Sequence, residues 1–170
     1  LGVEHLLRGL DHLLFVLALV FIVDGRWKLI KTITAFTVAH SITLALATLG
    51  FISIPSAPVE AAIALSIVFL ACEIIHHKRG RTSLTFDRPW LVAFAFGLLH
   101  GLGFAGALSE IGLPPSEVPI ALLFFNIGVE LGQLVFVFAV IALGWVVARL
   151  SRGILPVSAL TTPMVYAIGT

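Results

Sequence analysis

Residues 118–147 read VPIALLFFNIGVELGQLVFVFAVIALGWVV, and this stretch decides the fold class. Its one ionisable side chain is Glu130, and it exceeds the roughly 20 apolar residues that a helix needs to cross a bilayer core. In lipid, a lone apolar segment satisfies its backbone polar groups by forming an α-helix. We therefore expect a membrane-spanning helix that is long enough to tilt or to protrude from the bilayer.

The composition of the whole chain agrees with a membrane protein. Of its 170 residues, 59% are hydrophobic and 11% are charged, whereas soluble chains carry about 25% charged residues. A water-soluble fold is therefore excluded. The net charge of +1 offers no concentrated basic face to a nucleic acid. The single cysteine, Cys72, excludes a disulfide within the chain, and we expect it to be a small core residue.

The other apolar runs predict an all-α, polytopic transmembrane helix bundle, with residues 1–170 forming a single domain. We expect five full spans and a partial sixth, which Pro156 and Pro163 interrupt. Because Leu1 is neither an initiator methionine nor the start of a basic signal-peptide region, we expect a fragment or the membrane part of a longer chain. The expected spans are 3–23, 29–49, 59–77, 90–109, 118–147 and, in part, 154–170.

The basic residues predict how the bundle is oriented. All lysines and arginines except Arg8 fall in the segments 26–31, 78–88 and 149–152, which share one side of the predicted bundle. The loops at the opposite ends of the spans carry none. Because cytoplasmic loops carry an excess of Lys and Arg, we expect these segments in the cytoplasm and the N-terminus outside, in a bacterial inner membrane.

Ionisable side chains within the spans indicate where function lies. A charge at bilayer depth costs a few kcal/mol, so it normally faces the bundle interior and has a partner. The groups that fall near mid-span are Asp11, His12, His40, His100 and Glu130. Imidazoles and carboxylates together suit Ni, Co, Zn, Fe or Mn. We therefore predict a midplane centre that binds a divalent transition metal.

Further polar residues would serve the approaches to this centre. In a continuous helix His5 and His12 share one face, two turns and about 10 Å apart, which places His5 near the outer mouth. We expect Arg8 to be the counter-ion of Glu4 or Asp11, and His76 and His77 to be interfacial residues without a ligand role. The auxiliary residues are Glu4 and Glu60 at the outer mouth, Glu73 towards the cytoplasm, and Asn126 and Gln133 beside Glu130.

Several motifs resemble those of the HupE/UreJ family of nickel and cobalt permeases, and most closely its second branch. They are His5-x5-Asp11-His12 within Gly-Leu-Asp-His-Leu-Leu, Ala39-His40-Ser41, Leu99-His100-Gly101, and Phe125-Asn126 through Glu130-Leu131-Gly132-Gln133. The resemblance covers nearly the whole chain. It implies that His5, Asp11, His12 and His100 are metal ligands.

The sequence departs from the family pattern after the His100-Gly101 pair. Nickel permeases of the family tend to have a second His and a Glu there, whereas residues 102–106 read Leu-Gly-Phe-Ala-Gly. This difference leaves the identity of the metal open, with His40 and Glu130 completing the ligand set.

These observations favour a transporter over an enzyme. The expected cargo is a divalent ion, with Ni or Co favoured and Zn, Fe and Mn as alternatives, and the expected partners are the bilayer and the metal ion, with a homo-oligomer left open. One alternative is an intramembrane zinc hydrolase that uses Glu130 or Asp11 as base with Ser41 nearby. Another is a haem-binding protein with two midplane histidines as axial ligands.

Overall fold

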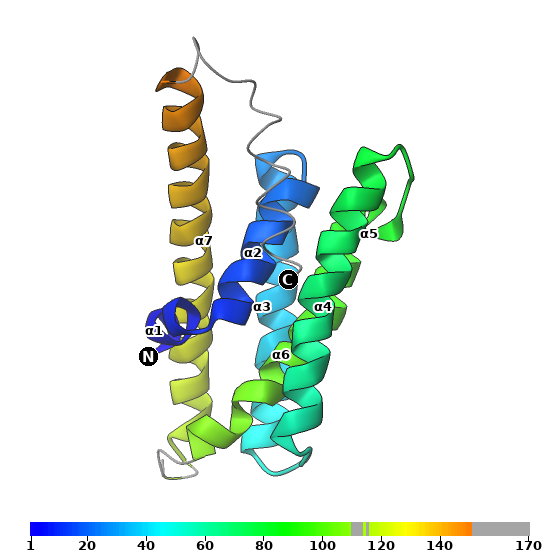
Figure 1. Cartoon of the computed structure of the whole chain (residues 1–170). Coiled ribbons are helices and arrows are strands. Elements are labelled where there is room, and N and C mark those ends of the chain that lie inside the picture. The colour runs from blue at the N-terminus through cyan, green and yellow to red at the C-terminus, as the bar shows by residue number, and fades with distance from the viewer. Residues whose placement is uncertain (110–113, 115, 151–170) are drawn as a thin grey trace.

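The computed structural model describes residues 1–109, 114 and 116–150, and this part of the chain is helical without any strand (Figure 1). The all-α bundle is therefore confirmed, while the partial sixth span at 154–170 lies outside the described residues. The helices are α1 (Gly2–Arg8), α2 (Leu10–Ile22), α3 (Arg26–Thr48), α4 (Ser56–Lys78), α5 (Leu84–Asp87), α6 (Pro89–Ser109) and α7 (Val118–Leu150).

Most of these helices run side by side along one axis (Figure 1). By length and composition α3, α4 and α7 are suited to cross a membrane, and α1 with α2 add a fourth, broken span. The helix α6 is also apolar, and it packs extensively on α3 and along α4. The α2–α3 turn with the start of α3, the end of α4 with the α5 segment and its flanking turns, and the end of α7 lie at one end of the bundle. They hold every described lysine and arginine except Arg8.

The first span is not a continuous helix, which corrects the prediction for residues 3–23. Gly9 adopts an extended conformation with φ −81° and ψ 92°, and α1 and α2 meet there at 83°. As Figure 1 shows, α1 lies across α7 and the N-terminus sits partway along the bundle. Small residues permit this crossing, since a Cβ added to Gly2 would meet the Gly128 Cα at 3.0 Å and the Phe125 carbonyl oxygen closer still.

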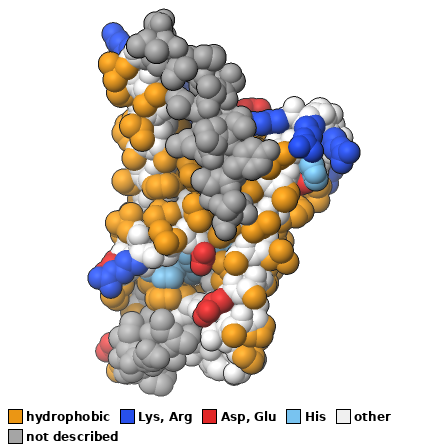
Figure 2. All heavy atoms as spheres, viewed as in Figure 1, with side chains coloured by type: hydrophobic (Ala, Val, Ile, Leu, Met, Phe, Trp, Pro, Cys, Tyr) orange, Lys and Arg blue, Asp and Glu red, His pale blue; other side chains and the backbone are white. Residues whose placement is uncertain are grey.

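Large apolar side chains fill the centre of the bundle and also cover its outside. Phe15, Phe36 and Leu70 are fully buried between the helices. Figure 2 shows further hydrophobic side chains over the visible faces of α7 and α4, as expected of helices in lipid. Cys72 on α4 is exposed, so the prediction that it is a core residue is wrong. An apolar run alone does not tell which face of a helix meets the lipid.

Candidate metal centre

Four histidines from four helices meet where the first span breaks. One ring nitrogen from each of His5, His12 and His40 lies within 4.8 Å of the others. The ring of His100 lies beside this group, with its centroid 4.8 Å from that of His12. The side chains of His12, His40 and His100 are buried, and that of His5 is half-buried. We call these four residues the histidine cluster.

The bend at Gly9 creates this cluster. Two helical turns would separate His5 from His12 by about 10 Å, yet their ring centroids are 4.7 Å apart. A Cβ on Gly9 would lie 3.0 Å from the His12 Nδ1 and 3.1 Å from the His5 carbonyl oxygen. Glycine therefore leaves room for both histidines at the bend, and His5 lies close to His12 rather than about 10 Å away.

Several buried ring nitrogens of the cluster lack a hydrogen-bond partner among the described residues. The buried atoms without a hydrogen bond in the described part of the chain include the Nε2 of His5, His12 and His40, and both ring nitrogens of His100. A buried polar atom left unpaired costs about 1–3 kcal/mol, and native structures keep few of them. Their concentration in one place indicates a site built for a ligand that accepts nitrogen lone pairs.

Phenylalanines enclose the cluster. The ring centroid of Phe104 lies 3.8 Å from that of His5. The ring centroid of Phe36 lies 5.1 Å from that of His100 and 6.0 Å from that of His12. These apolar neighbours leave the imidazoles as the main polar groups beside the rings. Imidazole nitrogens suit Zn, Cu, Fe and Ni. The role of Phe104 was not predicted, because a phenylalanine in an apolar run carries no signal of a site.

A row of polar side chains on α7 pairs with α3 beside the cluster. The Asn126 Oδ1 lies 3.2 Å from the His40 Nδ1. Thr37 Oγ1 donates to the Gln133 Oε1 at 3.0 Å. Thr34 Oγ1 donates to the Glu130 Oε1 at 2.7 Å. The three auxiliary or ligand candidates on α7 thus face α3, and the carboxylate of Glu130 is held by a threonine.

Neither predicted midplane carboxylate joins the histidine nitrogens. Among the described residues, the group of metal-ligating side chains comprises His5, His12 and His40, without Asp11 or Glu130. The side chain of Asp11 is exposed at the start of α2. Asp11 and His12 are adjacent in α2 but differ in burial, so Asp11 does not share the surroundings of His12. A ligand role for Asp11 and Glu130 stays a prediction.

The remaining candidates lie away from the cluster. Glu4 pairs with Arg8 at 2.8 Å, which confirms one of the two partners expected for Arg8. Glu60 is exposed near the start of α4. At the other end of that helix, the Glu73 Oε2 accepts a hydrogen bond of 2.7 Å from Thr85 Oγ1. His77 stacks on Phe86, with ring centroids 3.6 Å apart, and His76 is half-buried beside it in the sequence.

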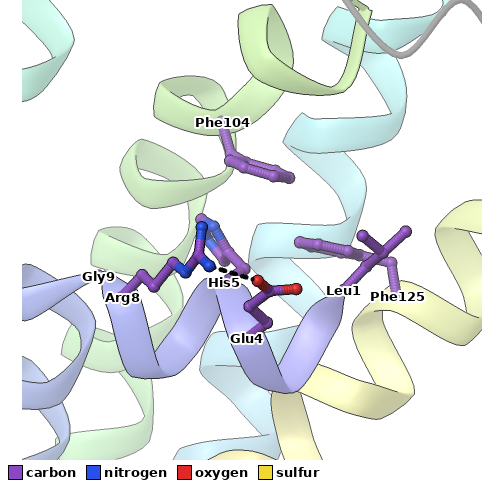
Figure 3. Close-up of a pocket in the computed structure, with 7 residues that line it drawn as sticks. All are labelled: Leu1, Glu4, His5, Arg8, Gly9, Phe104 and Phe125. Carbon is purple, nitrogen blue, oxygen red and sulfur yellow. Dashed lines mark ion pairs between the residues drawn. The ribbon is translucent and has the colours of Figure 1, made fainter.

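A cavity of about 450 Å³ opens beside His5 (Figure 3). In Figure 3 the rings of Phe104 and Phe125 flank the cavity above α1, and the Glu4–Arg8 ion pair lies at its edge. His5 belongs both to the wall of this cavity and to the histidine cluster. The cavity is lined by Leu1, Glu4, His5, Arg8, Gly9, Phe104 and Phe125.

The fold and the site define a polytopic helical membrane protein with buried histidines gathered at a break in its first span. Over residues 1–169 the chain matches the model of a family described as HupE / UreJ protein. The chain therefore belongs to the HupE/UreJ family, which is associated with nickel and cobalt transport, and the resemblance of its motifs is confirmed. No curated protein and no solved structure matches it.

Proposed function

We propose that this protein is a permease that binds a divalent transition metal at the histidine cluster and moves it across the membrane. Ni and Co are the favoured ions, and Zn, Fe and Mn are the alternatives. The observation that carries the proposal is the convergence of four imidazoles whose buried nitrogens lack partners. A neutral imidazole nitrogen is a common ligand of such ions.

The depth of the cluster supports a site near the membrane midplane. A helix rises 1.5 Å per residue, so the His12 backbone lies about 15 Å from the end of α2 at Ile22. By the same reckoning His100 lies about 16 Å from the start of α6 at Pro89. Both distances are about half of the roughly 30 Å hydrocarbon core.

A path through the protein follows from the groups on either side of the cluster. The cavity beside His5 provides an entrance, and the Glu4 carboxylate in its lining is paired there with Arg8. Beyond the cluster, the ion follows the polar side chains between α3 and α7 past Glu130, towards the end that carries the basic residues. That end faces the cytoplasm by the distribution of Lys and Arg, which makes the protein an importer.

Metal uptake into proteoliposomes, measured beside metal content, tests the proposal. Wild type should show saturable uptake of Ni²⁺ or Co²⁺. His12→Ala should lose most of the bound metal and the uptake, because the ion then lacks one of its buried ligands. The matched control is the double variant His76→Ala/His77→Ala on α4, outside the cluster, which should retain both.

The same experiment distinguishes the alternatives. Full metal occupancy without uptake under an imposed membrane potential would favour the zinc hydrolase. The contacts do not support that reading, because the Ser41 Oγ donates to its own helix at the Thr37 carbonyl and Glu130 accepts from Thr34. A haem Soret band in the purified protein would favour the haem-binding protein. An empty site in the double variant with a filled site in His12→Ala would contradict the placement of the site.

A further inference from the structure

We infer that Asn126 is a positioning residue, which fixes the tautomer of His40 so that the Nε2 lone pair faces the metal site. The hydrogen bond between the Asn126 Oδ1 and the His40 Nδ1 joins two helices, since Asn126 lies on α7 and His40 on α3. The consequence for metal binding rests on the proposed function. The tautomer itself is a property of the metal-free protein.

The orientation of the Asn126 amide is set by its own helix. One end of the amide lies 2.8 Å from the Leu122 carbonyl oxygen. A carbonyl oxygen can only accept a hydrogen bond, so the group facing it must be the Nδ2 amide, which donates. The reversed amide would set two acceptors against each other in a buried place, since the Asn126 side chain is only 8% exposed. The Oδ1 therefore has to face His40.

The fixed amide oxygen then decides where His40 carries its proton. The Oδ1 accepts, so the His40 Nδ1 at 3.2 Å must be the donor. A neutral imidazole has one N–H, which leaves the lone pair on the Nε2. This atom is buried and has no partner among the described residues. His40 thus presents its free lone pair to the cluster before any metal arrives.

This arrangement differs from what an unconstrained histidine would adopt. A neutral imidazole without neighbours favours the proton on Nε2, the nitrogen that has to bind the metal here. Metal-binding histidines commonly donate their other N–H to a fixed acceptor, and loss of that acceptor typically lowers metal affinity by about 10–100-fold. In this protein the acceptor is a side-chain amide on a neighbouring helix. The packing of α7 on α3 therefore also determines whether the His40 Nε2 lone pair is free to bind the metal.

The experiment records the ¹⁵N chemical shifts of ¹⁵N-histidine-labelled protein in nanodiscs after metal removal by a chelator. The signals of His40 are assigned by their loss in His40→Gln. In wild type we expect a protonated Nδ1 and an unprotonated Nε2. Asn126→Leu should move the proton to Nε2 and weaken Ni²⁺ binding by about 10–100-fold. Asn126→Asp keeps an oxygen that accepts from the Nδ1–H, and its protonated carboxyl can donate to the Leu122 carbonyl in place of the Nδ2. This variant should preserve both the tautomer and binding.

Gln133→Leu is the matched control. Gln133 is a second buried amide on α7, but its partner is Thr37 rather than a histidine. This variant should leave the His40 tautomer unchanged. A wild-type His40 protonated on Nε2, or an Asn126→Leu variant with unchanged tautomer and affinity, overturns the inference. Should Asn126→Leu fail to fold, the wild-type and Asn126→Asp spectra still decide it. The expected tautomer in a protein that binds none of the ions Ni²⁺, Co²⁺, Zn²⁺, Fe²⁺ and Mn²⁺ would refute the proposed function alone.

Discussion

Replacing Gly101 by alanine should separate α6 from α3 and open the histidine cluster. Gly101 follows His100 on α6 and faces the backbone of His40 on α3. A Cβ there would lie within 3.0 Å of the Thr43 Oγ1 and of the His40 carbonyl group. One turn earlier, a Cβ on Gly97 would meet the Phe36 carbonyl group and lie 3.0 Å from the Ala39 Cβ. The helices therefore touch through small residues, as glycine-rich membrane interfaces do.

The size of the effect follows from these distances. Moving the His40 carbonyl carbon from 3.0 Å to 3.4 Å, where ordinary contact begins, takes a shift of at least 0.4 Å. Metal–ligand distances tolerate only about 0.2 Å, so a site that uses both His40 and His100 loses its geometry. Overpacking of this kind costs about 1–3 kcal/mol of stability. We expect lower thermal stability and a fall in Ni²⁺ affinity of about 10-fold or more.

Thermal unfolding in detergent and Ni²⁺ titration, run side by side, check this prediction. Gly144→Ala is the control, because Gly144 is an exposed helical glycine of α7, and no described residue beyond its own stretch of helix comes within 4 Å of an added Cβ. That change should leave binding intact and stability equal or slightly higher, since alanine favours a helix by up to about 1 kcal/mol. Equal stability and affinity in Gly101→Ala and Gly144→Ala would refute the reasoning.

Three further predictions concern topology, the path and protons. Cysteines introduced into 26–31 or 78–88 should react only with membrane-permeant reagents, because the positive-inside rule predicts that these basic loops face the cytoplasm; labelling of intact cells by an impermeant reagent would reverse the orientation. Glu130→Gln should slow metal uptake in proteoliposomes through the loss of a negative charge on the path, whereas Ser41→Ala should be mild because its hydroxyl bonds within its own helix. Bound metal should be released once the pH is low enough to protonate the imidazoles, since protons compete with the metal for the ring nitrogens; metal that stays bound under strongly acid conditions would contradict histidine ligation.

Much of the architecture follows from the sequence because lipid imposes a simple rule on apolar runs. The helices α3, α4 and α7 were predictable from length and hydropathy, and their shared end from the positions of Lys and Arg. The break at Gly9 was not. A single glycine costs a helix only about 1 kcal/mol, and the bend depends on the packing of Gly2 against α7, which the sequence pattern does not reveal.

The candidate site, like the fold, could be predicted from the sequence only in part. His12, His40 and His100 could be grouped by counting residues from the span ends, because depth in a membrane follows from position along a helix. The direction of a side chain around the helix is set by tertiary packing, so Asp11 beside His12 emerged exposed. His5 required the bend to reach the cluster, and the pairing of Asn126 with His40 required the register of α7 against α3.

X-ray absorption spectroscopy of the metal-loaded protein tests the central claim most directly, because it reports the atoms that bind the ion. With zinc as the probe, the account predicts nitrogen ligands at about 2.0–2.1 Å with the scattering pattern of several imidazoles. It also predicts that this pattern weakens in His12→Ala. A bound ion surrounded by oxygen atoms alone, or a spectrum that His12→Ala leaves unchanged, would contradict it.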